Sequence, residues 1–227
     1  MMSSNLNRLK IIAEGLGELC RNVVFVGGTV AELYADDPAS TDIRPTMDVD
    51  CVVELATYGS LQEFEGRLRK QGFENDIESG VICRWKYNGE TVDIMPDRDS
   101  IYGFTNQWYR PGFQHRIVYE LPNGIAVNIL PPLYYIGTKI EAIRNRGGED
   151  LRLSHDFEDL IYVLNNCRDI ISLFDNENNK ILAEYISSWA SEVLSRPNCL
   201  EEIECMLPYG EYDRVEYIIR ILNHFKR

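Results

Sequence analysis

Residues 23–50 constrain the fold of this chain more than any other segment. They open with the run VVFV, which is apolar and β-branched as in a buried strand, and Gly27 and Gly28 follow directly. The next residues suit a helix (29–35), and the run MDVDCVVEL beyond them suits a second strand. A strand, a glycine turn, a helix and a second strand in close succession predict an α+β fold built on a mixed sheet.

Asp48 and Asp50 lie two residues apart in the second of these strand-like runs. Because the side chains of a strand alternate with a period of two, both carboxylates should lie on one face of the sheet. Two carboxylates on one face repel each other unless a cation lies between them. The spacing therefore predicts a cation site.

Gly27, Gly28 and Thr29 indicate a second kind of ligand. A backbone without side chains can approach phosphate oxygens closely, and the amides at the start of the following helix are free to receive them. A phosphate cradle beside the cation ligands predicts phosphoryl or nucleotidyl chemistry.

Asp93 is expected to join the same site. It lies in the alternating run TVDIM, which Asn88-Gly89, a strong hairpin-turn dipeptide, separates from the strand-like run VICRWKY. The hairpin should carry Asp93 into the sheet beside the earlier pair. Three converging carboxylates that share Mg²⁺ with a triphosphate are what an in-line displacement at phosphorus requires.

The order of these motifs resembles the nucleotidyltransferase superfamily of the DNA polymerase beta type. Within it, the chain is most similar to the AbiEii/AbiGii toxin-type nucleotidyltransferases of bacteria, over roughly residues 20–165. One departure is His155, where a basic residue is expected. The matching motifs are Gly27-Gly28, Arg44-Pro45-Thr46-Met47-Asp48-Val49-Asp50, Asp93, Lys139 with Arg144 and Arg146, and Asp156 with Asp159.

The resemblance implies a mixed-sheet nucleotidyltransferase core followed by a helical C-terminal lobe, and a Mg²⁺-dependent transfer of a nucleoside monophosphate from an NTP to an acceptor hydroxyl. Asp48, Asp50 and Asp93 would hold the metal and act in catalysis. Arg44 and Thr46 would order the preceding loop. The NTP would be bound by Gly27, Gly28, Thr29 and Lys139, and the catalytic set would also include Lys139 and Asp156.

The resemblance also implies a biological role. The chain would be the toxin of a toxin–antitoxin or phage-defence pair, with a cognate antitoxin as partner and RNA, at the 3′ end of tRNA, as acceptor.

Each motif also has a structural interpretation. Two glycines after a strand can simply make a tight turn, and solvated turns often contain two carboxylates at this spacing. Lys139 would be a surface lysine that lies along apolar neighbours. Asp156 and Asp159 would be acids in the first turn of a helix capped by Ser154 and stabilised by its dipole.

Two other functions fit the composition. A net charge of -13 is unlike the basic footprint of a simple nucleic-acid binder and would suit a small-molecule, aminoglycoside-like nucleotidyltransferase, since acids attract polycations. The other alternative is a non-catalytic nucleotide-binding or partner-binding protein of the same fold. The carboxylate triad argues against it, because three converging like charges are costly without a cation.

Residues 98–119 differ from the acidic remainder. Arginines and aromatic side chains alternate there, as on surfaces that stack with bases, and the trio Trp108, Tyr109 and Arg110 is the part expected to be exposed. The alternative is a core loop, an interpretation that suits Phe104 and Phe113 better.

No apolar run approaches the ~20 residues of a membrane span, and the N-terminus is amphipathic rather than signal-like. The six cysteines show no CxxC spacing. We therefore expect a cytoplasmic protein with no membrane partner, whose cysteines are reduced and mostly buried.

Periodicity and turn residues predict the remaining elements and a division into residues 1–130 and 131–227 at Pro131-Pro132. A second hairpin is expected at Asn123-Gly124. Helices are expected over residues 4–19, 60–71, 132–146, 154–166, 168–174, 177–194, 200–206 and 212–225.

Overall fold

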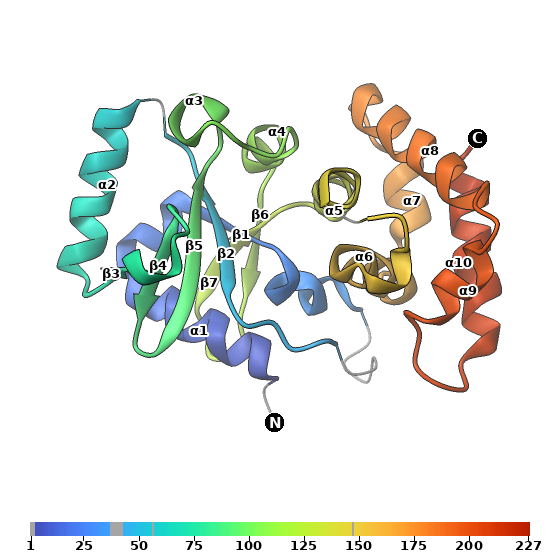
Figure 1. Ribbon diagram of the computed structural model, residues 1–227, viewed down its shortest axis with the longest axis horizontal. Coiled ribbons are helices and arrows are strands. Elements are labelled where there is room, and N and C mark those ends of the chain that lie inside the picture. The colour runs from blue at the N-terminus through green and yellow to red at the C-terminus, as the bar shows by residue number, and fades with distance from the viewer. Residues whose placement is uncertain (1–2, 37–42, 56, 147) are drawn as a thin grey trace. The chain divides into compact units, whose positions relative to one another are not determined.

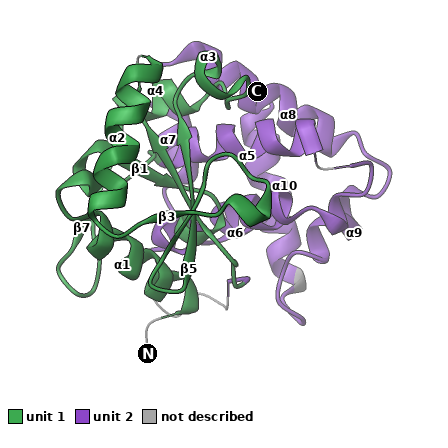
Figure 2. Ribbon diagram, turned by 60° about the vertical axis from the view of Figure 1, so that its left-hand side comes forward, with its two compact units in different colours: residues 1–30, 45–131 green, residues 31–44, 132–227 purple. Residues whose placement is uncertain are grey.

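The computed structural model describes residues 3–36, 43–55, 57–146 and 148–227 of the chain (Figure 1). The chain forms two compact units (Figure 2): the first unit comprises residues 1–30 and 45–131, and the second comprises residues 31–44 and 132–227. The sequence predicts one boundary near residue 130, whereas the structure also assigns residues 31–44 to the second unit.

Packing explains why this early segment belongs to the second unit. The ring of Tyr34 lies 4.7 Å from that of Tyr135, measured between centroids. The backbone amide of Asp36 donates to the carbonyl of Asn166 at 3.1 Å. The partners lie 101 and 130 residues further along the chain, so no local sequence pattern indicates that residues 31–44 belong to the second unit.

The first unit is built on a mixed sheet of seven strands among the described residues, in the order β3-β4-β5-β2-β1-β7-β6. The pairs β1–β7 and β2–β5 are parallel, and the other neighbours are antiparallel. The α+β mixed-sheet prediction is confirmed. The strands are β1 (Val23–Val26), β2 (Val49–Val53), β3 (Glu74–Asn75), β4 (Arg84–Tyr87), β5 (Glu90–Pro96), β6 (Ile117–Glu120) and β7 (Ala126–Ile129).

The centre of the sheet forms the core of the first unit. All four residues of β1 are buried, as expected for a strand between β2 and β7 that is covered on both faces. Helix α1 (Ser4–Leu16) packs against β2 and β5 and buries Leu9, Ile12 and Leu16, three positions spaced for one helical face. It ends earlier than predicted, because Gly17 at φ +52° leads into the 3-10 helix η1 (Gly17–Asn22).

The hairpin at Asn88-Gly89 forms as predicted. Both turn residues have positive φ, +52° and +83°, which is the conformation of a two-residue type I′ turn. The turn sets the register of β4 and β5, and in that register Arg84 lies opposite Asp93. The predicted second hairpin also forms, between β6 and β7, with Gly124 at φ +83°.

Helix α2 (Tyr58–Lys70) begins two residues before the predicted helix, because Thr57 and Ser60 form a capping box at its start. Three short helices of this unit are not marked by any periodicity in the sequence. They are η3 (Ile77–Ser79), α3 (Asp99–Tyr102) and α4 (Tyr109–Gln114).

The second unit is helical, as predicted. Helices α5 and α6 pack against each other, α5 also packs against α8, and α10 packs against both α6 and α8. The 3-10 helix η2 (Gly28–Tyr34) links the two units in place of the predicted helix over residues 29–35. The helices are α5 (Pro132–Arg146), η4 (Leu151–Leu153), α6 (His155–Asn166), α7 (Ile170–Asp175), α8 (Lys180–Leu194), α9 (Cys199–Glu204) and α10 (Tyr212–Phe225).

Two further expectations concern the chain as a whole. In the part of the chain that the structure describes, no helix has the length and apolar character needed to span a membrane. Five of the six cysteines are buried, which confirms the prediction of mostly buried thiols, and all six are free in the structure.

Candidate active site

Two neighbouring strands carry the three predicted metal ligands in the sheet of the first unit: Asp50 lies on β2, Asp48 just before it, and Asp93 on β5. Strands β2 and β5 are parallel neighbours, and their register places Asp50 beside Asp93. Asp48 precedes Asp50 by two residues and therefore lies on the same side of the chain. Asp93 is buried, whereas Asp48 and Asp50 are half-buried, so the group faces solvent on one side.

Arg84 lies between two of these carboxylates. Its Nε donates to Oδ1 of Asp93 at 2.8 Å and its Nη2 donates to Oδ2 at 2.7 Å, a bidentate pair. The same Nη2 donates to Oδ2 of Asp48 at 3.0 Å. The hydrogen bonds with Asp93 raise the pKa of Arg84 further above its usual range, so the guanidinium is a permanent positive charge in this site.

Cys83, which precedes Arg84, is not a candidate nucleophile at neutral pH. Burial and, after it, the nearby charge of Asp93 raise the pKa of its thiol to about 11. A thiol in this state is almost entirely protonated, and the thiolate is the reactive form. The chemistry of the site therefore rests on the carboxylates.

The donor chemistry of the site fits a divalent cation. Carboxylate oxygens are the ligands that Mg²⁺ prefers, and Nη2 of Arg84 already lies within 3.0 Å of an oxygen of Asp48 and an oxygen of Asp93, as a cationic group shared by two carboxylates. The spacing of the side chains is a separate matter: within the described residues, no three His, Cys, Asp or Glu side chains are grouped closely enough to hold a metal. In this arrangement the guanidinium of Arg84, not a metal ion, is the cationic group between Asp48 and Asp93.

Gly27 is required by the carboxylate of Asp50. A Cβ at position 27 would lie 2.0 Å from Oδ2 of Asp50, far inside contact distance, and the backbone there has φ +73°. The sequence predicts that this glycine lets a phosphate approach the backbone. The structure shows a second requirement for glycine: the backbone at position 27 lies against the carboxylate of Asp50, a candidate metal ligand, and leaves no room for a side chain.

Replacing Gly27 with alanine is expected to destabilise the first unit by about 2 to 4 kcal/mol, because positive φ costs about 1 to 3 kcal/mol in a non-glycine residue and the Cβ would also displace Asp50. Gly124→Ala is the matched control, since Gly124 has φ +83° but no atom within 4 Å of the added Cβ. Urea denaturation of both variants separates the two effects. An equal loss in both would show that Asp50 does not need the space.

Thr29 holds the loop that carries Asp48. Its side chain is buried and its Oγ1 donates to the carbonyl of Asp48 at 2.7 Å, with Oγ1 of Thr46 at 3.0 Å. The amide of Thr46 in turn donates to Oδ1 of Asn5 at 2.9 Å. These contacts account for the threonine of the R-x-T-x-D-x-D motif as a positioning residue. The sequence predicts that Thr29 is part of the phosphate cradle; its hydroxyl is engaged inside the protein.

The other predicted site residues form a separate buried cluster in the second unit. Nζ of Lys139 donates to Oδ1 of Asp156 at 3.1 Å and to Oδ2 of Asp159 at 2.6 Å, where Lys139 is 5% exposed and Asp159 is 1% exposed. Arg146 binds Asp156 through its Nε at 2.9 Å. Arg44 reaches Asp159 at 3.3 Å. We call these five residues the Lys139 cluster.

The Lys139 cluster changes the interpretation of its members. Lys139 is not a surface lysine, because two buried carboxylates surround its ammonium group. Ser154 caps α6 as predicted, with its Oγ accepting from the amide of Phe157 at 3.3 Å. Asp156 and Asp159 are more than acids of the first helical turn, because each also pairs with positively charged side chains. The catalytic roles assigned to Lys139 and Asp156, and the phosphate contact assigned to Lys139, remain predictions.

The cluster predicts how stability depends on pH. Burial alone would raise the pKa of Asp156, but Lys139 and Arg146 outweigh it and lower that pKa below its usual 3.8. Burial alone would lower the pKa of Lys139, but Asp159 and Asp156 outweigh it and raise that pKa above its usual 10.5. Asp156 therefore contributes to the free energy of unfolding above pH 3.8, and this contribution is lost as the pH falls through the lowered pKa. Lys139 contributes below pH 10.5, and its contribution is lost as the pH rises through the raised pKa.

Thermal melts between pH 7 and pH 2.5 test the predicted loss of stability in acid. Asp156→Asn should reduce the loss of melting temperature in acid, because the variant has no carboxyl to protonate at that position. Parallel curves for the variant and the parent protein would show that Asp156 does not contribute.

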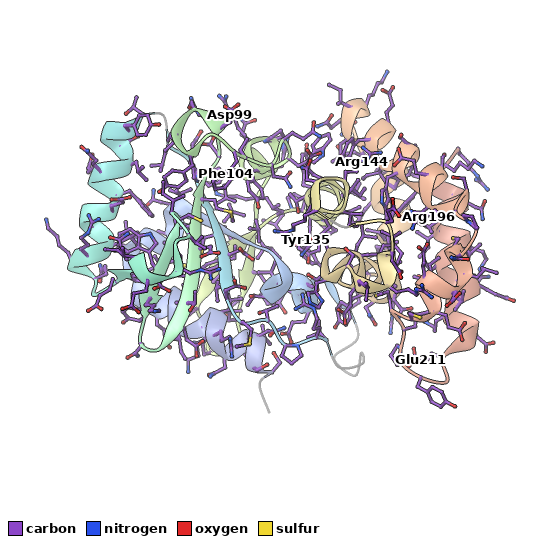
Figure 3. All side chains as sticks on the ribbon, viewed as in Figure 1. Asp99, Phe104, Tyr135, Arg144, Arg196 and Glu211 are labelled. Atoms are coloured by element: carbon purple, nitrogen blue, oxygen red, sulfur yellow. The ribbon has the colours of Figure 1, made fainter. Side chains whose placement is uncertain are left out.

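The arginine-rich and aromatic segment at residues 98–119 corrects the sequence interpretation. Trp108 is buried, with 4% of its surface exposed, and it precedes α4, whereas Phe104 is 48% exposed. Figure 3 shows Phe104 just after α3, and its ring stacks on that of Tyr102 at 6.1 Å between centroids. The exposed aromatic of this segment is therefore Phe104, and Arg110 is the exposed member of the predicted trio.

The chain resembles known proteins in its structure and not in its sequence. No family model matches the chain, and no curated protein sequence matches it. Among solved structures, it is similar to an antigenic nucleotidyltransferase-like protein from Paracoccidioides brasiliensis, with 18% sequence identity, 89% of this chain and 93% of that chain covered, and a TM-score of 0.49. A likeness at this level says nothing about the chemistry, which depends on the side chains described above.

Proposed function

We propose that this chain is a Mg²⁺-dependent nucleotidyltransferase that transfers a nucleoside monophosphate from an NTP to an acceptor hydroxyl. The observation that supports this proposal is that Asp50 and Asp93 are neighbours in register on β2 and β5, with Asp48 just before β2 and a cationic nitrogen shared by Asp48 and Asp93. Three carboxylates outnumber the single guanidinium of Arg84, which pairs with two of them, so this arrangement favours a further cation.

In this proposal each residue has a defined task. Asp48, Asp50 and Asp93 would hold Mg²⁺, which when bound supplies charge neutralisation at the triphosphate and activation of the acceptor hydroxyl. Asp93 is the buried member and would accept the proton of that hydroxyl as a general base. The backbone at Gly27 and Gly28, which is half-buried, would receive the phosphates.

The acceptor we propose is RNA, at the 3′ end of tRNA, with the chain acting as the toxin of a toxin–antitoxin or phage-defence pair. The exposed Phe104 could stack on a base, and the exposed guanidinium groups of Arg110 and Arg116 could neutralise phosphates. These three side chains come from one segment, residues 98–119, of a chain whose net charge is -13.

Incubation with each radiolabelled NTP, Mg²⁺ and either total RNA or a panel of aminoglycosides tests the function directly. Label in RNA supports the proposal, and label in an aminoglycoside keeps the chemistry but replaces the acceptor. No label with any NTP or acceptor, from protein that is folded and binds Mg²⁺, would leave a non-catalytic nucleotide-binding or partner-binding role.

A further inference from the structure

Arg84 has no task in the chemistry proposed above, yet it makes three hydrogen bonds to two of the three candidate metal ligands. It comes from β4, which neighbours the strand that carries Asp93, and the type I′ turn at Asn88-Gly89 fixes it opposite that residue. The turn and the strand pairing therefore build the guanidinium into the site.

We propose that Arg84 is an internal competitor of the divalent cation. Its guanidinium holds Asp48 and Asp93 together while no cation is bound, and it must release Asp93 before a cation can be ligated there. This inference rests on the proposed function, because it assumes that the three carboxylates ligate a metal.

The geometry at Asp93 is the reason for competition rather than coexistence. The bidentate pair engages both oxygens of this buried carboxylate, at 2.8 Å and 2.7 Å, which leaves no oxygen free of the guanidinium. At Asp48 the same nitrogen engages Oδ2. A divalent cation between these carboxylates would also lie against a permanent positive charge, and the repulsion adds to the loss of ligand atoms.

Competition has a consequence for loading of the site. A cation can bind with its intrinsic affinity only in the fraction of molecules from which Arg84 has withdrawn, so the apparent affinity of the parent protein is reduced by that fraction. A triphosphate offers the withdrawn guanidinium a new anionic partner. Binding of nucleotide and binding of cation should therefore favour each other, and Arg84 should carry part of this coupling.

Mn²⁺ binding measures the competition without any catalytic assay. Mn²⁺ is titrated into the folded full chain, and free Mn²⁺ is read by electron paramagnetic resonance for the parent protein, Arg84→Gln, Arg84→Lys, Asp93→Asn and the control Lys86→Gln. Lys86 lies on the same strand two residues along, is exposed and pairs with Asp76, so its replacement removes one positive charge from β4 without touching the site.

We expect Arg84→Gln and Arg84→Lys to bind Mn²⁺ about tenfold more tightly than the parent protein, because each loses the bidentate pair with Asp93, and Lys86→Gln to bind as the parent does. Arg84→Lys separates competition from simple repulsion, since it keeps the charge but not the planar fork. It also decides the matter by itself if Arg84→Gln does not fold.

Other outcomes overturn the inference in distinguishable ways. If the parent protein binds Mn²⁺, Asp93→Asn does not, and both Arg84 variants bind as the parent does, the competition is wrong while the metal site stands. Tighter binding in Arg84→Gln with parental binding in Arg84→Lys would indicate repulsion without displacement. If neither the parent protein nor any variant binds Mn²⁺, both the inference and the proposed metal-dependent function are wrong.

Discussion

Replacement of Lys139 by methionine is expected to lower the free energy of unfolding by about 3 to 5 kcal/mol, the usual cost of removing one partner from a buried ion pair. Methionine fills a similar volume, so the loss reports charge rather than a cavity. The variant loses the contact of Asp159 with the ammonium group of Lys139, at 2.6 Å, and keeps its longer contact with Arg44, at 3.3 Å. Asp159 is 1% exposed, so water cannot replace the lost partner. Urea denaturation at pH 7, followed by circular dichroism, measures the change.

Lys180→Met is the control, because Lys180 is exposed at the start of α8 and its loss should cost little. The double variant Lys139→Met with Asp159→Leu should be more stable than Lys139→Met alone, since it removes one of the stranded carboxylates. If Lys139→Met lowers the free energy of unfolding by less than about 1 kcal/mol, the ion pairs of Lys139 contribute no more than ordinary surface pairs do, and the prediction is wrong.

The sequence predicted the sheet and its carboxylates because the signals were local. The alternation of MDVDCVVEL and the turn dipeptide at Asn88-Gly89 define which face of a strand each residue occupies, and the structure has Asp50 and Asp93 as neighbours in register. The same turn also contained the signal for Arg84. A two-residue loop fixes every pair of the hairpin, so it places an arginine opposite an aspartate, a favourable cross-strand pair.

The burial of Lys139 in the second unit could not be predicted from local sequence patterns. A lysine in an amphipathic helix is usually placed on its solvent face, yet nine of the fifteen residues of α5 are buried and Lys139 is one of them. Its partners Asp156 and Asp159 lie 17 and 20 residues further on, on another helix. Only the packing of α5 on α6 brings the charges together, and periodicity carries no information about it.

Trp108 shows the same limit in the first unit. Its neighbours in sequence are polar and basic, which favoured an exposed side chain, but the ring is buried. Phe104, which the sequence favoured as a core residue, is exposed instead. In an irregular segment the fraction of a ring that is exposed depends on distant packing, whereas composition identifies only the type of surface.

Asp93→Asn is expected to reduce nucleotidyl transfer at least about 10³-fold, a loss of roughly 4 kcal/mol of transition-state stabilisation, while most ground-state affinity for NTP remains. Asparagine keeps the shape of the side chain but removes the charge that would bind the metal and accept the proton. Asp99→Asn is the control, since Asp99 is an exposed aspartate six residues along the chain. Initial rates with the labelled NTP, together with calorimetric titration of NTP, separate the chemical step from binding.

Asp93→Asn is expected to lower the stability of the metal-free protein, whereas relief of charge repulsion alone would raise it. Three carboxylates without a cation should gain stability when one is neutralised, but Asp93 is the bidentate partner of Arg84, so its loss leaves a guanidinium with Asp48 as its remaining recorded ion-pair partner. We therefore expect the metal-free melting temperature of Asp93→Asn to fall below that of the parent protein, and Asp99→Asn to leave it unchanged. A higher melting temperature would show that repulsion dominates and that Arg84 contributes little, whereas parental transfer rates would show that these carboxylates are not the active site.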